Sequence, residues 1–481
     1  MHNHLIITLK LQFYILFGII NLLFICWTNS PTFLIKLTFI YIFLLIYLLL
    51  YYHLFIEEQN IAITSFIIFN YLFFVIGPVV QLKNHITNDL LPNTFIINYN
   101  YIIQTNLYIV LFLFVFIVSY LYLKNRQKNF FRKPDKTKLS IRDYQIVSII
   151  LIIITIFIMM IYSNIIYNLF FFREKDFGFS THFNLIISRT LFMLPLSVVI
   201  LSWYYRKTKK IFLALFFISL ILLIFLKNPF TDKRNAIGAI YLCILFFMFP
   251  VFFKTNFRTF IFLFTIMVIL FPLSSIFTHS MFGFALFSEK PIELIIYEFT
   301  KSDLLDEFNR LDYDTWSEFN TTIEYVNING ISYGKQLGNA LLFFIPRAIW
   351  PGKPLNSGFE IGNYIMNNYP LNYNNLSESY VAEGYINFGI IGILIYPIIL
   401  SISIIYMSNW LKSKDILKKT TTIYFSFHLV FLLRGDFTNG FVYFIGTYIA
   451  VYLIPKFILF LLRILRVSNH SILKYNYTLN S

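Results

Sequence analysis

Two charged residues stand out between residues 343 and 354, because their neighbours are apolar or conformationally restricted. Arg347 follows a proline and is bracketed by isoleucine, alanine and tryptophan, an unusual setting for a merely solvated charge. Lys353 lies between a glycine and a proline, in a turn that fixes where its ammonium points. Guanidinium and ammonium groups bind anions, so both residues are candidate ligands. The alternatives are an ion pair of Arg347 with Glu360 and an interfacial role for Lys353.

A carboxylate and an amide share one face at the start of a predicted helix. Glu383 directly precedes a predicted membrane span over 384–408, and Asn387 lies one turn further along. The helix N-terminus favours the ionised form of a carboxylate, as a general base requires. Glu383 is therefore the preferred proton acceptor, and the alternative is a carboxylate that only interacts with the helix dipole. Asp436 and Glu378 are the competing bases.

Three further arginines lie at or inside predicted spans. Arg234 and Arg434 are near span ends, and Arg189 lies within the predicted span over 183–205. An ionisable side chain at membrane depth is a functional candidate by default. For each arginine the alternative is a positional anchor or a buried ion pair.

Metal and nucleotide sites have little support. The sequence contains no His-Glu-x-x-His motif, and its two cysteines, Cys26 and Cys243, both fall in apolar runs. Asp312 and Asp314 form an Asp-x-Asp pattern, but in an acidic stretch where this spacing arises by chance. Since phosphate-binding glycine patterns are also missing, we expect neither a metal nor a cofactor.

Long apolar segments must position these residues. The chain has 481 residues, of which 58% are hydrophobic and only 13% charged, whereas soluble domains carry about 25% charged residues. The apolar runs approach the length that crosses ~30 Å of hydrocarbon, and they lack the alternation of barrel strands. We therefore predict an all-α polytopic membrane protein of about twelve spans. They cover residues 11–27, 34–55, 61–82, 101–123, 146–165, 183–205, 211–226, 235–253, 257–284, 384–408, 421–433 and 441–462.

Basic residues mark alternate connections, as the positive-inside rule requires when both termini are cytoplasmic. Such residues cluster at 124–142, 206–210, 254–258, 412–419 and 463–474. The net charge of +15 is thus mostly explained by topology, and no nucleic-acid partner is indicated.

The chain divides into nine spans within 1–284, a large extracytoplasmic loop over 285–383, and three spans with a cytoplasmic tail in 384–481. Loops of this size are usually functional. In residues 288–330, acidic side chains alternate with apolar ones at spacings of three and four, which predicts surface-lying amphipathic helices. Residues 331–383 are rich in Gly, Pro, Asn and Tyr and hold isolated charges.

Several stretches together resemble the Wzy-type oligosaccharide repeat-unit polymerases of bacterial surface-polysaccharide assembly. The order of a Gly-x-Ser stretch, a Pro-Arg-x-Ile-Trp-Pro-x-Lys-Pro stretch and a Glu-x-Tyr-x-Asn-Phe-Gly helix start is similar to that family. Arg347 and Gly358 also satisfy an Arg-x₁₀-Gly pattern described for these enzymes. The matching stretches are 330–338, 343–354 and 377–389, with 228–234 and 433–436 similar in character.

The resemblance implies a glycosyltransferase C-type-like bundle in the bacterial cytoplasmic membrane, with its active site facing outward. Such enzymes transfer a growing glycan from undecaprenyl diphosphate to a new lipid-linked repeat unit. The implied partners are this lipid-linked oligosaccharide and the bilayer, with a chain-length regulator and a flippase as possible associates. Under this resemblance Arg347 becomes the leading diphosphate ligand and Glu383 the base. The other substrate-binding candidates are Lys353, Arg234, Arg434, Arg189, Asp436, Glu378 and Asn387.

Three other functions compete with a polymerase. An O-antigen ligase would share the topology, but deleting a ligase leaves long unattached chains, whereas deleting a polymerase leaves single repeat units. A flippase or other transporter would place ionisable residues along the bundle interior and have short loops. The crowding of charges in 285–383 argues against that class. A non-catalytic scaffold would not explain the placement of Arg347 and Glu383.

Overall fold

The computed structural model is helical, and its described residues contain no β-strand. It describes residues 2–27, 32–87, 97–126, 140–163, 182–229, 232, 234–270, 293, 306–309, 311–369, 374 and 376–465. The chain separates into two compact units. Unit 1 comprises residues 1–132, 251–409 and 426–441, and unit 2 comprises residues 133–250, 410–425 and 442–481.

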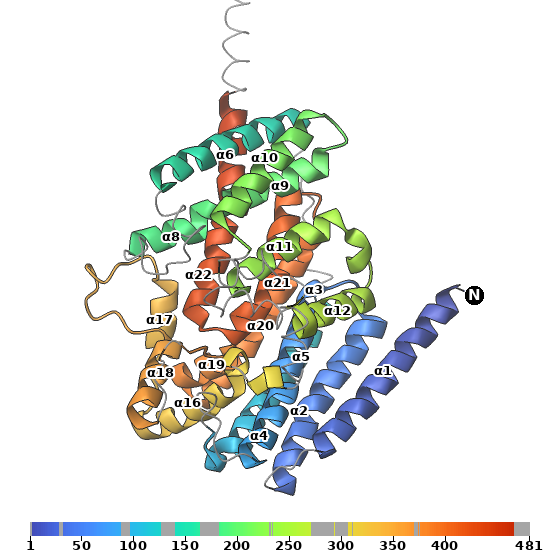
Figure 1. The fold of residues 1–481 in the computed structure, drawn as a ribbon, viewed down its shortest axis with the longest axis vertical. Coiled ribbons are helices and arrows are strands. Elements are labelled where there is room, and N and C mark those ends of the chain that lie inside the picture. The colour runs from blue at the N-terminus through green and yellow to red at the C-terminus, as the bar shows by residue number, and fades with distance from the viewer. Residues whose placement is uncertain are drawn as a thin grey trace, which may run out of the picture. The chain divides into compact units, whose positions relative to one another are not determined.

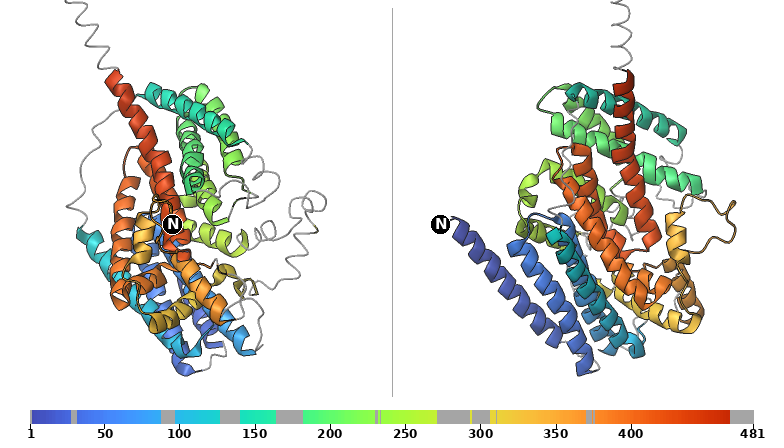
Figure 2. Two further views of the ribbon diagram at one scale, coloured as in Figure 1. Left: turned by 90° about the vertical axis from the view of Figure 1, so that its left-hand side faces the viewer. Right: turned by 180° about the vertical axis from the view of Figure 1, so that it is seen from behind.

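Unit 1 contains the N-terminal helices and the segment that holds most predicted site residues. Its helices are α1 (His2–Trp27), α2 (Phe33–Tyr51), α3 (Ile61–Tyr71), α4 (Gly77–Thr87), α5 (Ile102–Arg126), α12 (Asn256–Thr265), α16 (Thr315–Asn329), α17 (Lys335–Leu341), α18 (Ser357–Asn368) and α19 (Tyr380–Phe388). Helices α1, α2 and α5 lie side by side, as the right-hand view of Figure 2 shows, and α16 contacts both α18 and α19 (Figure 1).

Unit 2 is built around α9 (Leu194–Tyr205), which packs against α6 (Ile141–Ile161), α10 (Ile211–Leu226) and α11 (Arg234–Met248). Its remaining helix is α8 (His182–Thr190). Trp203 of α9 donates its indole N–H to the Phe247 carbonyl at 3.0 Å. The residues of α20 (Ile390–Leu411), α21 (Ile416–Arg434) and α22 (Phe437–Tyr448) are divided between the two units.

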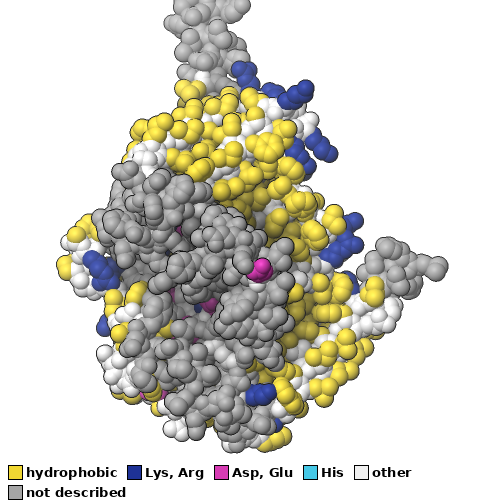
Figure 3. All heavy atoms as spheres, viewed as in Figure 1, with side chains coloured by type: hydrophobic (Ala, Val, Ile, Leu, Met, Phe, Trp, Pro, Cys, Tyr) yellow, Lys and Arg dark blue, Asp and Glu magenta, His cyan; other side chains and the backbone are white. Residues whose placement is uncertain are grey.

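Apolar side chains on the outside of the helices fit a lipid environment. Phe33 and Leu23 are 78% and 64% exposed, which water would disfavour over a whole helix face. In Figure 3, apolar side chains dominate the described part of one face, and lysines and arginines lie mainly at its margins. The inner helices differ from this surface, since the segment Ile61–Lys83 is almost wholly buried.

Nine helices among the described residues are long and apolar enough to cross a membrane, which confirms a polytopic helical protein. Three shorter apolar helices, Ile211–Leu226, Ala236–Met248 and Asn256–Ile269, overlap the other three predicted spans, and residues 271–284 of the last of these lie outside the described residues. A total of twelve spans therefore stays a prediction. Many basic residues used to predict the orientation, including those of 127–139 and 466–474, lie outside the described residues.

The predicted span over 384–408 begins too early. Residues 380–388 form the separate helix α19, and the long apolar helix starts at Ile390. Gly389 lies between the two helices with φ of +60°, a backbone conformation that glycine adopts without the strain of a side chain. Gly384 and Gly392, on either side of this break, pack closely together. A Cβ on Gly392 would lie only 1.8 Å from the Gly384 carbonyl oxygen.

The prediction of surface-lying amphipathic helices is wrong for α16. Its residues from Thr315 through Glu324 are all buried. The reason is that its polar side chains find partners on neighbouring helices: Trp316 donates to Asn106 of α5 at 2.8 Å, and Asn320 donates to Thr105 at 3.2 Å. Most of the preceding acidic stretch, 288–305, lies outside the described residues.

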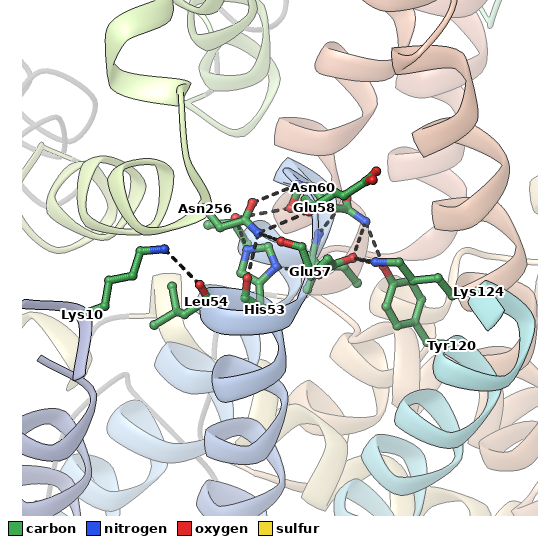
Figure 4. A network of polar contacts seen from close by, with 11 residues as sticks. Lys10, His53, Leu54, Glu57, Glu58, Asn60, Tyr120, Lys124 and Asn256 are labelled. Carbon is green, nitrogen blue, oxygen red and sulfur yellow. Dashed lines mark hydrogen bonds and ion pairs between the residues drawn. The ribbon is translucent and has the colours of Figure 1, made fainter. Parts of the chain in front are cut away.

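A polar network fixes the turn between α2 and α3 in unit 1 (Figure 4). The Glu57 carboxylate accepts hydrogen bonds from Tyr120 and from the ammonium of Lys124, both on α5. The ring nitrogen Nδ1 of His53 lies 2.7 Å from the other carboxylate oxygen. Asn256, at the start of α12, donates to the carbonyls of His53 and Glu57 at 2.7 and 3.1 Å. The network thus ties α5 and α12 to this turn.

Candidate functional site

Glu383 lies buried in α19 with both carboxylate oxygens hydrogen-bonded. The Ser357 hydroxyl donates to Oε2, and the amide of Asn387 donates to Oε1 at 3.2 Å. This confirms that Glu383 and Asn387 face each other one turn apart. Burial raises the pKa of the Glu383 carboxyl to about 7, although the hydrogen bonds from Ser357, Asn387 and the Phe437 N–H oppose that effect. A carboxyl of this pKa exchanges a proton near neutral pH, as a general base must.

Two further carboxylates near Glu383 are buried and only partly hydrogen-bonded. Thr322 donates to Glu378 Oε1 at 2.8 Å, while Glu378 Oε2 and Glu318 Oε2 have no hydrogen-bond partner within the described part of the chain. Burial, with neighbouring carboxylates, raises the pKa of both groups well above the usual range. Burial therefore favours the protonated form of both Glu318 and Glu378.

Asp314 and Asp436 complete what we call the acidic cluster, whose members are Asp314, Glu318, Glu378, Glu383 and Asp436. Burial raises the pKa of Asp314 to about 6, although Arg434 and Ser377 favour its charged form. Asp436 precedes α22 and accepts from the backbone N–H and the amide of Asn439 at 2.8 and 2.6 Å. Each member either raises the pKa of another member or has its own pKa raised by one.

Arg434 is the cation recorded beside this cluster. Its Nη2 lies 3.7 Å from Oδ1 of both Asp312 and Asp314. The Asp-x-Asp pattern therefore faces a guanidinium, which suits a structural ion pair. In the described ranges no group of three or more His, Cys, Asp or Glu residues could hold a metal ion.

The two cations of the loop after α17 hold that loop together. The Lys353 ammonium is buried and donates to the carbonyls of Leu342, Phe343 and Ile345 at 3.2, 3.1 and 2.9 Å. An ammonium has three donors, so these contacts occupy all of them. Lys353 thus fixes the turn. Its three carbonyl contacts account for the burial of the ammonium, and no bound substrate is needed to explain it.

Arg347 lies in the same loop but is exposed. Its guanidinium donates to the carbonyls of Lys353 and Pro354, which uses two of five N–H groups. The alternative partner considered above, Glu360, accepts instead from the Tyr325 hydroxyl at 2.8 Å. Arg347 is therefore oriented by backbone carbonyls and keeps donors for an anion.

The start of α18 joins this loop to the acidic cluster. Asn356, the residue before α18, donates to Asp436 at 3.3 Å, and Ser357 donates to Glu383. The structure therefore brings together Glu383, Glu378, Asn387, Asp436 and Arg434, with the Arg347 loop connected to them through two adjacent residues.

Arg189 and Arg234 belong to unit 2, whereas the acidic cluster belongs to unit 1. The Arg189 guanidinium lies 4.7 Å from the ring centroid of Tyr443. Arg234 begins α11, and its side chain lies outside the described part of the structure. Lys227, a buried lysine at the end of α10, was not predicted, although it directly precedes the 228–234 stretch.

Sequence reasoning also missed Asp314 as a cluster member, Glu318 and Ser357. Asp314 and Glu318 are spaced by four on α16, which places them on one helix face, but an acidic helix suggested an exposed face. Ser357 carried no signal, since a serine near a predicted helix start is usually a cap.

The family model described as O-antigen polysaccharide polymerase Wzy matches residues 361–461. No curated protein and no solved structure matches the chain. The matched segment contains Glu378, Glu383, Asn387, Arg434 and Asp436, whereas the Arg347 loop precedes it. The predicted resemblance is thereby confirmed: residues 361–461 of this chain match the O-antigen polysaccharide polymerase Wzy family.

Proposed function

We propose that this protein polymerises undecaprenyl-diphosphate-linked oligosaccharide repeat units into O-antigen or capsular polysaccharide at the outer face of the bacterial cytoplasmic membrane. The observation that carries the proposal is the buried, hydrogen-bonded Glu383 with a pKa of about 7, inside the segment that matches the polymerase family. A proton acceptor of this kind serves a transfer reaction and has no obvious use in a scaffold.

The proposed chemistry needs one proton acceptor and one diphosphate ligand. A hydroxyl of the acceptor repeat unit gives its proton to the Glu383 carboxylate while its oxygen bonds to the anomeric carbon of the donor glycan. The bond between that carbon and the diphosphate oxygen breaks, and undecaprenyl diphosphate leaves with the bonding electrons. A fixed cation that faces the departing diphosphate lowers the energy of this step.

Arg347 is the proposed diphosphate ligand, because it is exposed, oriented by two carbonyls and able to offer further N–H donors. Lys353 supports the same step indirectly by holding the loop. Arg434, which faces Asp312 and Asp314, orders the acidic cluster instead. With an arginine to bind the diphosphate, the proposed mechanism needs no metal ion.

The test is a polymerisation assay with the purified protein and the lipid-linked repeat unit. The readout is the ladder of glycan lengths that forms. We expect a ladder that chelation with EDTA leaves unchanged. A loss restored by Mg²⁺ or Mn²⁺ would contradict the metal-independent mechanism. In cells, deletion should leave single repeat units on the surface; long unattached chains would instead indicate a ligase.

The role of Arg347 can be tested by comparing a substitution that keeps the positive charge but changes the shape of the cation with one that removes the charge. A guanidinium grips two phosphate oxygens, whereas an ammonium is a point charge at another position. We expect Arg347→Lys to lose on the order of a hundredfold in rate and Arg347→Ala at least as much, with normal protein levels. Lys335→Ala, in the nearby helix α17, is the matched control. A normal ladder from Arg347→Lys would exclude the bidentate role.

A further inference from the structure

Helix α18 approaches a neighbouring segment more closely than any side chain would permit. A Cβ on Gly358 would lie 2.4 Å from the Leu376 carbonyl oxygen and 3.6 Å from the Asp436 Cβ. One turn further along, a Cβ on Gly362 would lie 2.0 Å from the Asn374 carbonyl oxygen. Both obstacles are backbone atoms, which a side-chain rotation cannot remove.

Backbone conformation does not explain why glycine occupies positions 358 and 362. Neither has a positive φ, and glycine inside a helix is less favourable than alanine. Gly338 of the nearby α17 differs, because a Cβ there would meet no atom within 4 Å. Close packing therefore explains the glycines of α18.

The close contact lies beside the proposed base. Ser357, the first residue of α18, donates to Glu383, and the preceding Asn356 donates to Asp436. On the other side of the contact, Ser377 donates to Asp314, and Glu378 accepts from Thr322. We therefore expect both sets of contacts to depend on the distance between α18 and the carbonyls of Asn374 and Leu376.

We infer that Gly358 and Ser357 are positioning residues for catalysis: Gly358 lets α18 close on the Leu376 carbonyl, and this holds the Ser357 hydroxyl on the Glu383 carboxylate. The inference rests on the proposed role of Glu383. It gives the glycine of the Arg-x₁₀-Gly pattern, Gly358, a structural role: it allows α18 to approach the backbone of Leu376 closely.

The Ser357 hydrogen bond has a measurable electrostatic consequence. A donor to a carboxylate stabilises the ionised form, so its loss raises the pKa of Glu383. The other titratable groups that interact with Glu383 are Asp436, Glu378, Tyr380 and Tyr396. Asp436 repels the Glu383 carboxylate, and the Tyr380 hydroxyl already donates to the Tyr396 carbonyl at 3.4 Å.

The experiment measures kcat against pH for Gly358→Ala, Ser357→Ala and Ser357→Thr. A small displacement at a reacting group can cost up to about a hundredfold, so we expect Gly358→Ala to lower kcat at least tenfold. Gly358→Ala and Ser357→Ala should both move the acidic limb of the profile to higher pH. Ser357→Thr keeps the hydroxyl and should retain the wild-type limb. Gly338→Ala is the matched control and should change neither kcat nor the limb.

An unshifted acidic limb in Ser357→Ala would overturn the inference, and so would wild-type kcat in Gly358→Ala. If Gly358→Ala does not accumulate, the two Ser357 variants still decide the question. Glu383→Gln separates this inference from the proposed function. Activity in Glu383→Gln would remove Glu383 as the base, whereas an inactive Glu383→Gln with normal Gly358→Ala and Ser357→Ala would overturn only the positioning roles.

Discussion

Two buried groups of carboxylates in unit 1 have opposite electrostatic surroundings. Burial disfavours the charge of Glu57, but His53 and Lys124 outweigh that cost and lower its pKa to about 2. In the acidic cluster, burial raises the pKa of Glu383 to about 7 and that of Glu378 well above its usual range. Both Glu57 and Glu383 have fully buried side chains, so burial alone does not explain the difference.

The difference lies in the partners. Glu57 meets a lysine, a histidine and a tyrosine, whereas the acidic cluster gathers five carboxylates beside Arg434. A carboxylate whose charge is neutralised by fixed partners holds helices together. Crowding of carboxyls raises their pKa values and destabilises the folded protein. Such an arrangement is typical of functional sites. The comparison indicates that Glu57 stabilises the fold, and it is consistent with the role proposed above for Glu383 as the base.

The largest expected effect is the loss of activity in Glu383→Gln. Removal of a general base typically costs about 10²–10⁴-fold in rate, and the amide still fills the space of the carboxyl. The measurement is the glycan ladder at matched protein level. Glu360→Gln changes a carboxylate of α18 that accepts from Tyr325 and should leave the ladder intact. An intact ladder in Glu383→Gln would transfer the role of base to Glu378 or Asp436.

Glu57→Gln should act on stability instead of chemistry. Breaking a buried ion pair by removing one partner destabilises by about 3–5 kcal/mol, because Lys124 keeps a partly buried charge. We expect a lower unfolding midpoint in detergent and less protein in the membrane, with normal activity per folded molecule. Glu58→Gln, at the adjacent residue, is the control. Unchanged stability together with lost activity would reverse the assignment of Glu57.

The two regions should also respond differently to pH. Glu383 and Asp314 bind protons more tightly in the folded protein than in the unfolded one, with pKa values of about 7 and 6 instead of 4.5 and 3.8. Stability should therefore rise as pH falls from 8 to 5, while activity falls because Glu383 becomes protonated. The contribution of Glu57 is complete above pH 4.5 and is lost only as pH falls toward 2. Activity and unfolding curves between pH 5 and 8 measure both trends; parallel loss of stability and activity would contradict them.

The smallest expected effect is that of Glu378→Gln. Because burial favours the neutral form of the Glu378 carboxyl, an amide of similar shape should preserve its charge state and its contact with Thr322. We expect activity and unfolding midpoint close to wild type at pH 7. A loss as large as that of Glu383→Gln would show that Glu378 ionises during the reaction, and the division of roles within the acidic cluster would change.

Local sequence patterns were sufficient for the features that depend on neighbouring residues. Apolar run length predicts where helices cross the bilayer, since backbone groups in hydrocarbon must be satisfied within each helix. The spacing of four between Glu383 and Asn387 predicts their contact, because helix geometry places them on one face. The family resemblance likewise came from residues in a fixed order along the chain.

The features that depend on distant residues were decided by the tertiary structure. The acidic face of α16 reads as exposed, yet it is buried because α5, α18 and α19 cover it with polar partners. Lys353 reads as a substrate ligand, yet its ammonium is occupied by three carbonyls of its own loop. Glu57 and Glu383 are both glutamates near helix ends, and only the side chains packed around them lower one pKa and raise the other. The charge state of a buried group depends on partners that folding brings from elsewhere in the chain, and no local pattern records them.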